Sequence, residues 1–312
     1  MPAAVFCAGN LVADILVRPV STVRWDTTTW VDSIQQSIGG NGANTSFALA
    51  RLGAHVVLTG AVGADPFGHF VLDHLRQAGV DTSLVQTVDA STAVTVGLVH
   101  DNGARAFLHR PGASAEAFSQ PVDFTAATGC SHFHLANVFG LPRMRPQAAD
   151  TLAQARRAGL TTSLDTGWDA RGEWMSIVEP CLPHLDLLMV NLDEARHLTG
   201  LGTAEEAAAK LRDLGAGRVV VKLGGDGCAV FAPEFSGPVP AFDVPVVDTT
   251  GAGDCFAGGF LTAWLAGASL EEAAVFANAA GARSVQSLGA VTGLLPRQEM
   301  LDWMKQTPQR YW

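Results

Sequence analysis

The chain has 312 residues, of which 48% are hydrophobic, and a formal net charge of −10. This length and composition allow a substantial core in one large domain with a smaller accessory piece. The negative charge argues against nucleic acid and anionic membrane as partners, because both favour basic surfaces. The five cysteines lack CxxC spacing and no apolar run reaches membrane-spanning length, so we expect a reduced, cytoplasmic protein.

In chain order, short β-rich runs alternate with Ala- and Leu-rich segments of helical periodicity. The expected strands are 4–8, 56–61, 132–135, 161–165, 187–191, 218–222 and 228–231. The expected helices are 43–52, 67–78, 145–158, 193–198, 204–214, 254–266 and 270–285. Glycines such as Gly53 and Gly159 follow several of these helices, which is typical of helix ends. The alternation predicts an α/β fold in which a doubly wound, mainly parallel sheet is flanked by helices.

Two segments, 11–38 and 91–110, break this alternation because they are rich in Val, Thr and Trp, with polar and apolar residues interleaved. They predict antiparallel strands that form a small β lid outside the main sheet. The main domain then comprises residues 1–10, 39–90 and 111–312. A small two-faced sheet needs other surfaces to pack on, and substrate, main domain or a second subunit would each serve.

The most informative segment, residues 247–259, combines a glycine turn, a helix start and one carboxylate. Valines before Asp248 predict the end of a strand, and Gly251 and Gly253 permit a tight turn before an apolar run of helical spacing. Asp254 is therefore expected near a helix N-terminus, whose unpaired N–H groups and dipole would stabilise a phosphoryl group during transfer. Its carboxylate could accept a proton from an attacking alcohol.

The sequence contains no GxxxxGK[ST] loop and no protein-kinase HRD or DFG set, which argues against the two best-known phosphate-binding architectures. The run DTTGAGDCFAGGF instead resembles the C-terminal signature of the ribokinase/PfkB carbohydrate kinases, and GGNGAN at 39–44 resembles their N-terminal signature. The resemblance covers nearly the whole chain. It implies a ribokinase-like fold and an enzyme that transfers the γ-phosphoryl group of ATP, with Mg²⁺, to a hydroxyl of a ribose-, fructose- or ketodeoxygluconate-type sugar.

The resemblance also implies roles for individual residues. Asp254 is the expected general base, and the backbone of Gly251, Ala252, Gly253 and Asp254 is the expected anion hole. Asp14 falls where the family places a carboxylate on two adjacent sugar hydroxyls, which favours a polyol ligand. The expected substrate-binding residues are Asp14, Gly39, Gly40, Asn41, Asn44 and Arg110.

The segment KLGGDG at 222–227 resembles the nucleotide loop of the family, although a hairpin turn between two strands explains its glycines equally well. Asn278 falls beside the expected adenine, on a predicted helix with small neighbours that helix packing would also explain. The expected ATP-binding residues are Asn191, Lys222, Gly224, Gly227, Thr249 and Asn278.

Asn191 and Glu194 match the NxxE element of the family at the end of a predicted strand. Their spacing suits Mg²⁺ bound to Glu194 through water, and a helix N-cap with a capping Glu has the same spacing. The resemblance further implies an activating K⁺ site. Its expected ligands are Asp248, Thr250, Ser284, Ser287 and Gly289. Ribokinases often have a basic residue where Ser287 stands, so the sequence leaves potassium dependence open.

The sugar itself is not fixed by the sequence. Residues 165–174 only loosely resemble the DPNxRxxLW segment of fructokinases and ketodeoxygluconate kinases, because its Pro and Asn are missing. Trp25 and Trp30 could stack on a sugar or a base, which keeps a nucleoside kinase of the same fold open. A non-catalytic relative should lose the base or the anion hole, and both motifs are intact. A nicotinamide dehydrogenase is poorly supported, because no GxGxxG follows the first strand.

Two further expectations concern partners and the buried histidines. The partner is expected to be a small sugar, and the lid of the resembled family often makes a dimer contact, so we expect a homodimer through the β lid. His132 and His134 alternate on a predicted strand without an evident Ser or Cys partner, and we interpret both as structural.

Overall fold

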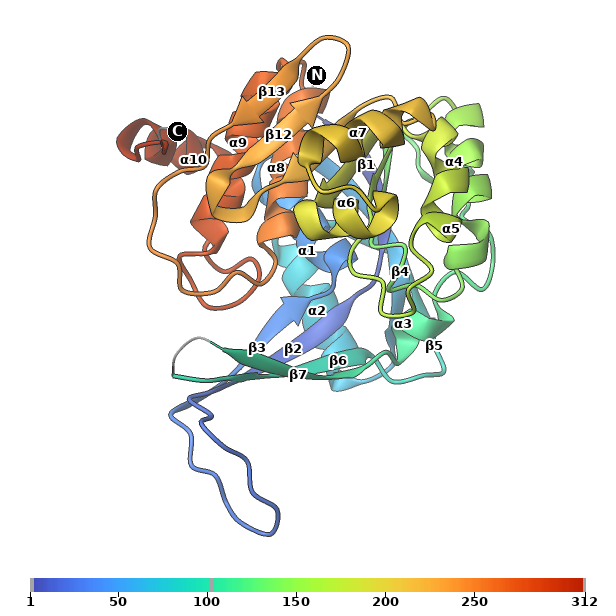
Figure 1. The fold of residues 1–312 in the computed structure, drawn as a ribbon. Helices are drawn as coiled ribbons and strands as arrows, with labels where there is room; N and C mark the ends of the chain where they lie inside the picture. The colour runs from blue at the N-terminus through green and yellow to red at the C-terminus, as the bar shows by residue number, and fades with distance from the viewer. Residues whose placement is uncertain (1–2, 102–103, 311–312) are drawn as a thin grey trace.

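The structure, a computed structural model, describes residues 3–101 and 104–310. Residues 1–2, 102–103 and 311–312, which the sequence assigns to the main domain and the lid, lie outside the described residues. The predicted fold class is confirmed, because a large, mainly parallel sheet is covered by helices and a small sheet lies apart from it (Figure 1). Within the described ranges, no helix has both the length and the apolar character needed to cross a membrane.

The large sheet has the order β13-β12-β11-β10-β9-β8-β1-β4-β5. The strands from β11 to β5 pair in parallel, whereas the pairs β11/β12 and β12/β13 at one edge are antiparallel. The carboxyl ends of the parallel strands therefore meet at one edge, where ligands bind in open α/β sheets. The strands are β1 (Ala4–Gly9), β4 (His55–Gly63), β5 (Asp81–Val88), β8 (His132–Ala136), β9 (Thr161–Asp165), β10 (Leu187–Asn191), β11 (Val219–Lys222), β12 (Cys228–Phe231) and β13 (Ser236–Val239).

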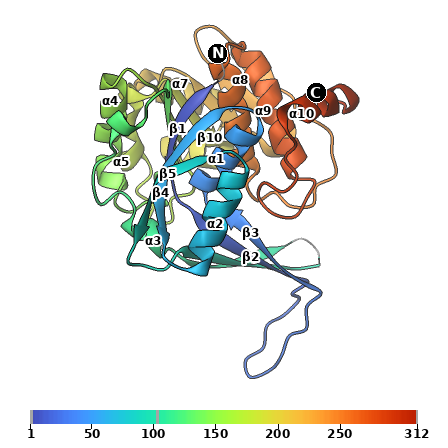
Figure 2. The ribbon, with the colours of Figure 1, turned by 180° about the vertical axis from the view of Figure 1, so that it is seen from behind.

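Helices cover both faces of this sheet (Figures 1 and 2). Alternate side chains of β1 enter two separate cores: Val5 and Cys7 pack with α1, α8 and α9, whereas Phe6 and Ala8 pack with α4, α6 and α7. The helices are α1 (Asn41–Arg51), α2 (Pro66–Gln77), α3 (Ala113–Glu116), α4 (Ala148–Arg157), α5 (Met175–Val178), α6 (Leu192–Thr199), α7 (Ala204–Asp213), α8 (Ala252–Leu265), α9 (Leu270–Ser284) and α10 (Arg297–Gln306).

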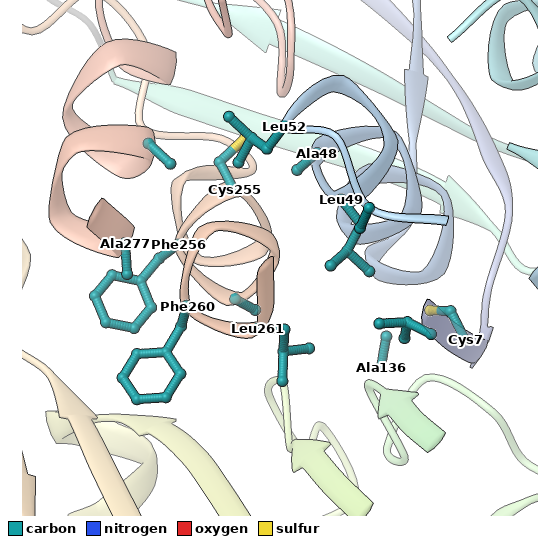
Figure 3. Packing of buried hydrophobic residues seen from close by; sticks show 14 of the residues in the cluster. Cys7, Ala48, Leu49, Leu52, Ala136, Cys255, Phe256, Phe260, Leu261 and Ala277 are labelled. Atoms are coloured by element: carbon teal, nitrogen blue, oxygen red, sulfur yellow. The ribbon is translucent and has the colours of Figure 1, made fainter. Parts of the chain in front are cut away.

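Close packing of α8 on α1 brings the two signature motifs together. A Cβ at Gly258 would lie 2.6 Å from the Cβ of Ala48, so a larger residue at 258 would push α8 away from α1. Figure 3 shows Cys255 of α8 pointing toward Leu52 of α1, within one continuous apolar cluster. The N-termini of the two helices, which carry the candidate catalytic and sugar-binding residues, are thereby fixed by the core.

The small sheet has the order β3-β2-β6-β7, with β2 (Val12–Arg18), β3 (Ser33–Gly39), β6 (Ala93–Val99) and β7 (Arg105–Arg110). The pairs β2/β3 and β6/β7 are antiparallel, as predicted, but β2 and β6 are parallel. The prediction failed at this pair because both strands leave the main domain directly after β1 and β5 and so run outward together. Residues 19–32 form an irregular loop that extends beyond the sheet (Figure 1).

Three local expectations were wrong. The valines before Asp248 are not in a strand; the amides of Val247 and Asp248 instead donate to the Val285 carbonyl, at 2.7 and 3.1 Å, so the end of α9 holds this segment. The helix expected from 145 begins with a 3₁₀ turn, Arg145–Gln147, before α4. The two histidines of β8 do have a serine partner, Ser163.

His132 and His134 lie on β8, and both contact the Ser163 hydroxyl of the neighbouring strand β9, each at 2.7 Å. The sequence could not show this pairing, because it depends on which strand lies beside β8. Both imidazoles are fully buried, and burial lowers the pKa of each below its usual value. The structural interpretation of the two histidines is consistent with this neutral, hydrogen-bonded environment.

Candidate active site

A cavity of about 430 Å³ opens beside the carboxyl ends of β10 and β11 and the N-terminus of α8. It gathers residues from both signature motifs, from the NxxE element and from the expected nucleotide loop. The expected site residues that line it are Asn41, Asn191, Glu194, Lys222, Gly224, Gly227, Thr249, Gly251, Ala252, Gly253, Asp254 and Asn278.

Asp254 lies in the first turn of α8 with both carboxylate oxygens held by amides of α1. Asn41 Nδ2 donates to Oδ1 at 2.7 Å, and Asn44 Nδ2 donates to Oδ2 at 2.8 Å. Burial raises the pKa of Asp254 to about 7. A carboxylate that titrates near neutral pH accepts a proton more readily than an exposed aspartate and is still ionised in a large fraction of molecules.

Asn137, which the sequence did not single out, supports this arrangement from the end of β8. Its Nδ2 donates to Asn41 Oδ1 at 2.7 Å, which orients the Asn41 amide so that its NH₂ faces Asp254. Asn137 itself has φ of 63°, and its Oδ1 accepts from the Gly140 amide at 2.9 Å. The only local signal was its place just after a buried strand.

The turn before α8 presents unpaired backbone donors beside this carboxylate. Gly251 has φ of 71°, and a Cβ there would lie 2.5 Å from the Cβ of Ala290, so the turn requires glycine. The Ala252 amide donates to the Thr249 carbonyl, whereas no hydrogen bond within the described part of the chain uses the amides of Gly251, Gly253 and Asp254. Unpaired donors of this kind, at the N-terminus of a helix, are able to bind an anion.

Lys222 places a positive charge next to the anion hole. Its Nζ lies 2.7 Å from Asp165 Oδ2, and only 3.3 Å from where a Cβ at Gly253 would be. Burial alone would lower the pKa of Lys222, but the carboxylates of Asp165 and Glu194 raise it above its usual value. Asp165 was not among the expected site residues, although it begins the segment that was compared with DPNxRxxLW.

Glu194 and Asn191 form the capping box that the sequence offered as an alternative. The Glu194 amide donates to Asn191 Oδ1 at 2.8 Å, and Glu194 Oε2 accepts from the Asn191 amide at 2.9 Å. Oε1 accepts no hydrogen bond among the described residues and the side chain lines the cavity, so the carboxylate also fits a water-mediated Mg²⁺ ligand. Burial raises the pKa of Glu194.

The expected nucleotide loop is a hairpin turn and part of the cavity wall at the same time. Strands β11 and β12 pair antiparallel across it, and the Leu223 amide donates to the Gly227 carbonyl at 2.8 Å. A Cβ at Gly227 would lie 2.2 Å from the Val239 carbonyl oxygen. Asn278 fixes the same carbonyl, because its Nδ2 donates to it at 2.9 Å.

The remaining sugar-binding candidates lie at the junction of the lid and α1, outside the cavity lining. A Cβ at Gly39 would lie 2.1 Å from Asp14 Oδ2, so glycine leaves room for this carboxylate. Burial raises the pKa of Asp14 to about 6, against a hydrogen bond from Thr95 that lowers it. Gly40 has φ of 85°, and a Cβ there would lie 2.6 Å from the Asn10 carbonyl oxygen.

The structure does not bring Arg110 to the cavity. Its Nη2 donates to the Thr92 carbonyl at 3.1 Å within the lid region. Another arginine of β7, Arg105, reaches the turn before α8 instead and contacts Asp248 there. Sequence reasoning missed Arg105 because no local motif marks it.

The residues of the expected K⁺ site gather around Asp248. Its Oδ1 accepts from the Thr250 amide and hydroxyl, and its Oδ2 accepts from the Gly289 amide at 3.0 Å. Ser284 Oγ donates to the Gly281 carbonyl at 2.8 Å, and the Ser287 amide donates to the Ser284 carbonyl at 3.3 Å.

Comparisons with known proteins identify the family of the chain. The profile of the pfkB family carbohydrate kinases matches residues 5–297. The chain is 35% identical to an ATP-dependent ribose-1-phosphate kinase of Halopiger xanaduensis, over 92% of this chain and 93% of that protein. It is 30% identical to a ribokinase of Haemophilus influenzae, over 95% of this chain and 97% of that protein.

Solved structures have the same fold. The fold is similar to that of Arabidopsis thaliana ribokinase complexed with ribose and ATP, with a TM-score of 0.85, 28% identity and coverage of 98% of this chain and 99% of that chain. It is also similar to aminoimidazole riboside kinase from Salmonella enterica complexed with aminoimidazole riboside and an ATP analog. That match has a TM-score of 0.77 and 26% identity, over 96% of this chain and 99% of that chain.

Proposed function

Because this chain belongs to the pfkB family of carbohydrate kinases, which are phosphotransferases with an alcohol group as acceptor, we propose that it transfers the γ-phosphoryl group of ATP to a small sugar. The sugar is of the ribose, fructose or ketodeoxygluconate type. One observation carries the proposal: the buried Asp254 carboxylate lies in the same helical turn as the unpaired amides of Gly251 and Gly253. A base and an anion hole at one point are what transfer to an alcohol requires.

The proposed nucleotide end of the cavity lies between the hairpin turn at Gly224 and helix α9 at Asn278. Phe242, Val244 and Ala282 line the same region and give it apolar walls that suit an adenine ring. The glycines at the hairpin turn allow the chain to approach the phosphates closely. The phosphate chain then runs toward Lys222 and the N-terminus of α8.

Protein donors that are already in position stabilise the negative charge of the transferred phosphoryl group. The amides of Gly253 and Asp254 donate to the phosphoryl oxygens, and Lys222 adds a positive charge close by. Glu194 would hold Mg²⁺ through water, and the bound ion supplies positive charge that offsets the charge of the phosphates. These donors stabilise charge that spreads over the equatorial oxygens during transfer.

The proton of the attacking hydroxyl passes to Asp254. Each Asp254 carboxylate oxygen accepts one amide donor, from Asn41 or Asn44, so each keeps a second lone-pair direction for the hydroxyl. Asp14, with a pKa near 6, is mostly ionised at neutral pH and accepts hydrogen bonds from two sugar hydroxyls. We expect a polyol to contact both carboxylates, and closure of the lid to exclude water.

A sugar without a base fits this chain better than a nucleoside. Trp25 and Trp30, the aromatic side chains that could have stacked on a base, are 91% and 89% exposed and belong to the loop beyond the lid. Neither lines the cavity. The nucleoside alternative therefore loses the residues on which it depended.

The direct experiment measures ADP release from ATP and Mg²⁺ with each acceptor in turn. The panel is ribose, ribose 1-phosphate, fructose, ketodeoxygluconate, aminoimidazole riboside and adenosine. We expect turnover with at least one of the first four and a loss of that turnover in Asp254→Asn. Turnover with only the last two would establish the nucleoside alternative, and no sugar-dependent ADP release with any acceptor would refute the kinase assignment.

We also propose that the chain forms a homodimer through the outer face of the lid. The register places Ile15, Val96 and Leu108 side by side, on the face opposite Asp14. Ile34 shares this face, and Ile34 and Leu108 are 67% and 65% exposed. Apolar side chains gathered on one face of a thin sheet favour burial against a second copy.

A further inference from the structure

Arg105 connects the lid to the turn that carries the anion hole. Its Nη1 donates to Asp248 Oδ1 at 2.7 Å and to Thr250 Oγ1 at 2.6 Å. Its Nη2 donates to Thr249 Oγ1 at 2.7 Å. One guanidinium from β7 therefore engages three consecutive residues immediately before Gly251.

The Asp248 carboxylate is already surrounded by hydrogen-bond donors in this arrangement. Oδ1 accepts from Arg105 Nη1, from the Thr250 amide at 2.9 Å and from Thr250 Oγ1 at 2.7 Å. Oδ2 accepts from the Gly289 amide at 3.0 Å. Three donors saturate Oδ1, whereas Oδ2 keeps one of its two lone-pair directions.

The charge of Asp248 is compensated as well. Its side chain is only 4% exposed, and that of Arg105 is 30% exposed. The Arg105 guanidinium lies 2.7 Å from this buried carboxylate and pairs with its charge. Asp248 and Thr250 of the expected potassium site therefore already hold a guanidinium, which supplies the positive charge that an added monovalent cation would bring.

We propose that Arg105 is the resident cation of this site and replaces a dissociable monovalent ion. It is a positioning residue, since it contacts Asp248, Thr249 and Thr250 and acts through them on the amides of the anion hole. Because Arg105 belongs to the lid, its charge is in place only when the lid lies against the main domain. The inference rests on the proposed kinase reaction and predicts turnover that does not require K⁺.

Arginine suits this position for a geometric reason. Its planar fork presents fixed donors to a carboxylate and two hydroxyls at once, whereas the single ammonium of lysine cannot reproduce the same set. The guanidinium carbon also lies 5.9 Å from the ring centre of Phe107, which shares the inner face of β7. Lysine at 105 is thus expected to restore the charge without restoring the geometry.

The first experiment compares turnover in the chlorides of K⁺, Na⁺ and choline at equal ionic strength, with the best acceptor of the sugar panel. We expect kcat of the unmodified protein to agree within about twofold in all three salts. An increase of about fivefold or more in K⁺ over choline would overturn the proposal. Both thresholds are well below the effect of removing a needed donor from an anion hole, about a hundredfold.

The second experiment removes the guanidinium. We expect Arg105→Ala to lower kcat about tenfold to a hundredfold in choline chloride, as small displacements of catalytic groups do, with little change in the KM of the sugar. Added guanidinium chloride at millimolar concentration, or K⁺, should restore part of kcat. The kcat of Arg105→Lys should lie between that of the unmodified protein and that of Arg105→Ala. The control is Arg24→Ala, which removes an exposed arginine from the loop at 19–32 and should leave kcat unchanged.

Other results would contradict the assignment in distinct ways. An unchanged kcat in Arg105→Ala would exclude a positioning role, and a raised sugar KM with unchanged kcat would assign Arg105 to the substrate. Thermal unfolding gives a readout independent of turnover. K⁺ should not shift the Tm of the unmodified protein relative to choline but should raise that of Arg105→Ala. If no sugar is phosphorylated, the kinase proposal fails while this comparison still tests the cation site.

Discussion

The turn before α8 is built differently on its two sides. On one side, Asp254 is held by amides of α1, and α1 and α8 are packed together through Gly258 in the core. On the other side, Asp248 is held by Arg105, which comes from a strand whose residues are all exposed. The comparison indicates that core packing forms the base in advance, whereas the compensating charge depends on where the lid lies.

The largest effect is expected from removing the preformed base. Asp254→Asn keeps the size of the side chain and should lower kcat by at least about a hundredfold, because general-base catalysis contributes about 10²–10⁴-fold. Binding of ATP and sugar should persist, since the proposed binding contacts of both lie on other residues. Steady-state kinetics and ligand-induced shifts of Tm measure the two quantities separately.

Asp302→Asn is a matched control, because Asp302 is an exposed carboxylate of α10. It should leave kcat and both Tm shifts unchanged. Near-native turnover in Asp254→Asn would show that another group takes the proton. Loss of ligand binding in that variant would instead assign Asp254 to substrate binding.

Loosening the helix pair that positions the base should have the next largest effect. Gly258→Ala places a methyl group 2.6 Å from the Ala48 Cβ and should lower the free energy of unfolding by about 1–3 kcal/mol, as overpacking does. The same shift separates Asp254 from the α1 amides, so kcat should fall too. Urea unfolding measures the stability.

Gly202→Ala is the control for this substitution. A methyl group added at Gly202 would meet no heavy atom within 4 Å, so the change in stability should stay within about 0.5 kcal/mol. If the two variants have equal stability, the close approach of α8 to α1 does not constrain the fold.

The sequence predicted the parts of the site that are encoded locally, which include the side of the turn that carries Asp254. The glycine turn with Asp254, the GGNGAN turn and the NxxE pair are local patterns, and the cavity gathers residues from all three. A few consecutive residues determine the chemistry of each pattern. A glycine turn that enters a helix, for example, defines both the backbone donors and the neighbouring carboxylate.

The residues that the sequence missed act across the fold. Arg105 meets Asp248 only because the β6/β7 hairpin folds back under the main domain. Asn137 reaches Asn41 only because β8 lies beside β1. The parallel pairing of β2 and β6 is of the same kind. None of these contacts has a local pattern, so neither composition nor periodicity could predict them.

The pH dependence of turnover sharpens the comparison at the base. Asp254 must be ionised to accept a proton, and burial raises its pKa to about 7. We therefore expect kcat/KM to fall as the pH drops below about 7 and to level off above about 8. A profile that stays flat down to pH 5 would contradict a buried base with a raised pKa.

Removing the charge of Lys222 or of Asp165 should shift the acid limb of the kcat/KM profile in opposite directions. The Lys222 ammonium lowers the pKa of Asp254 and the Asp165 carboxylate raises it. Lys222→Met should therefore shift the limb to higher pH, and Asp165→Asn should shift it to lower pH. Shifts in the same direction would indicate a general structural disturbance rather than an electrostatic effect.

The smallest effect on turnover is expected from the outer face of the lid. Ile34→Lys combined with Leu108→Lys puts like charges on the proposed dimer surface, so the solution mass should fall from dimer to monomer in light scattering. Both side chains face away from Arg105, so kcat should stay within about a factor of two. The control, Gln77→Lys with Thr128→Lys on the main domain, adds the same charge and should leave the mass unchanged.

A monomeric unmodified protein would exclude the lid dimer. A large loss of kcat on dissociation would show that the partner holds the lid, and with it Arg105, in place.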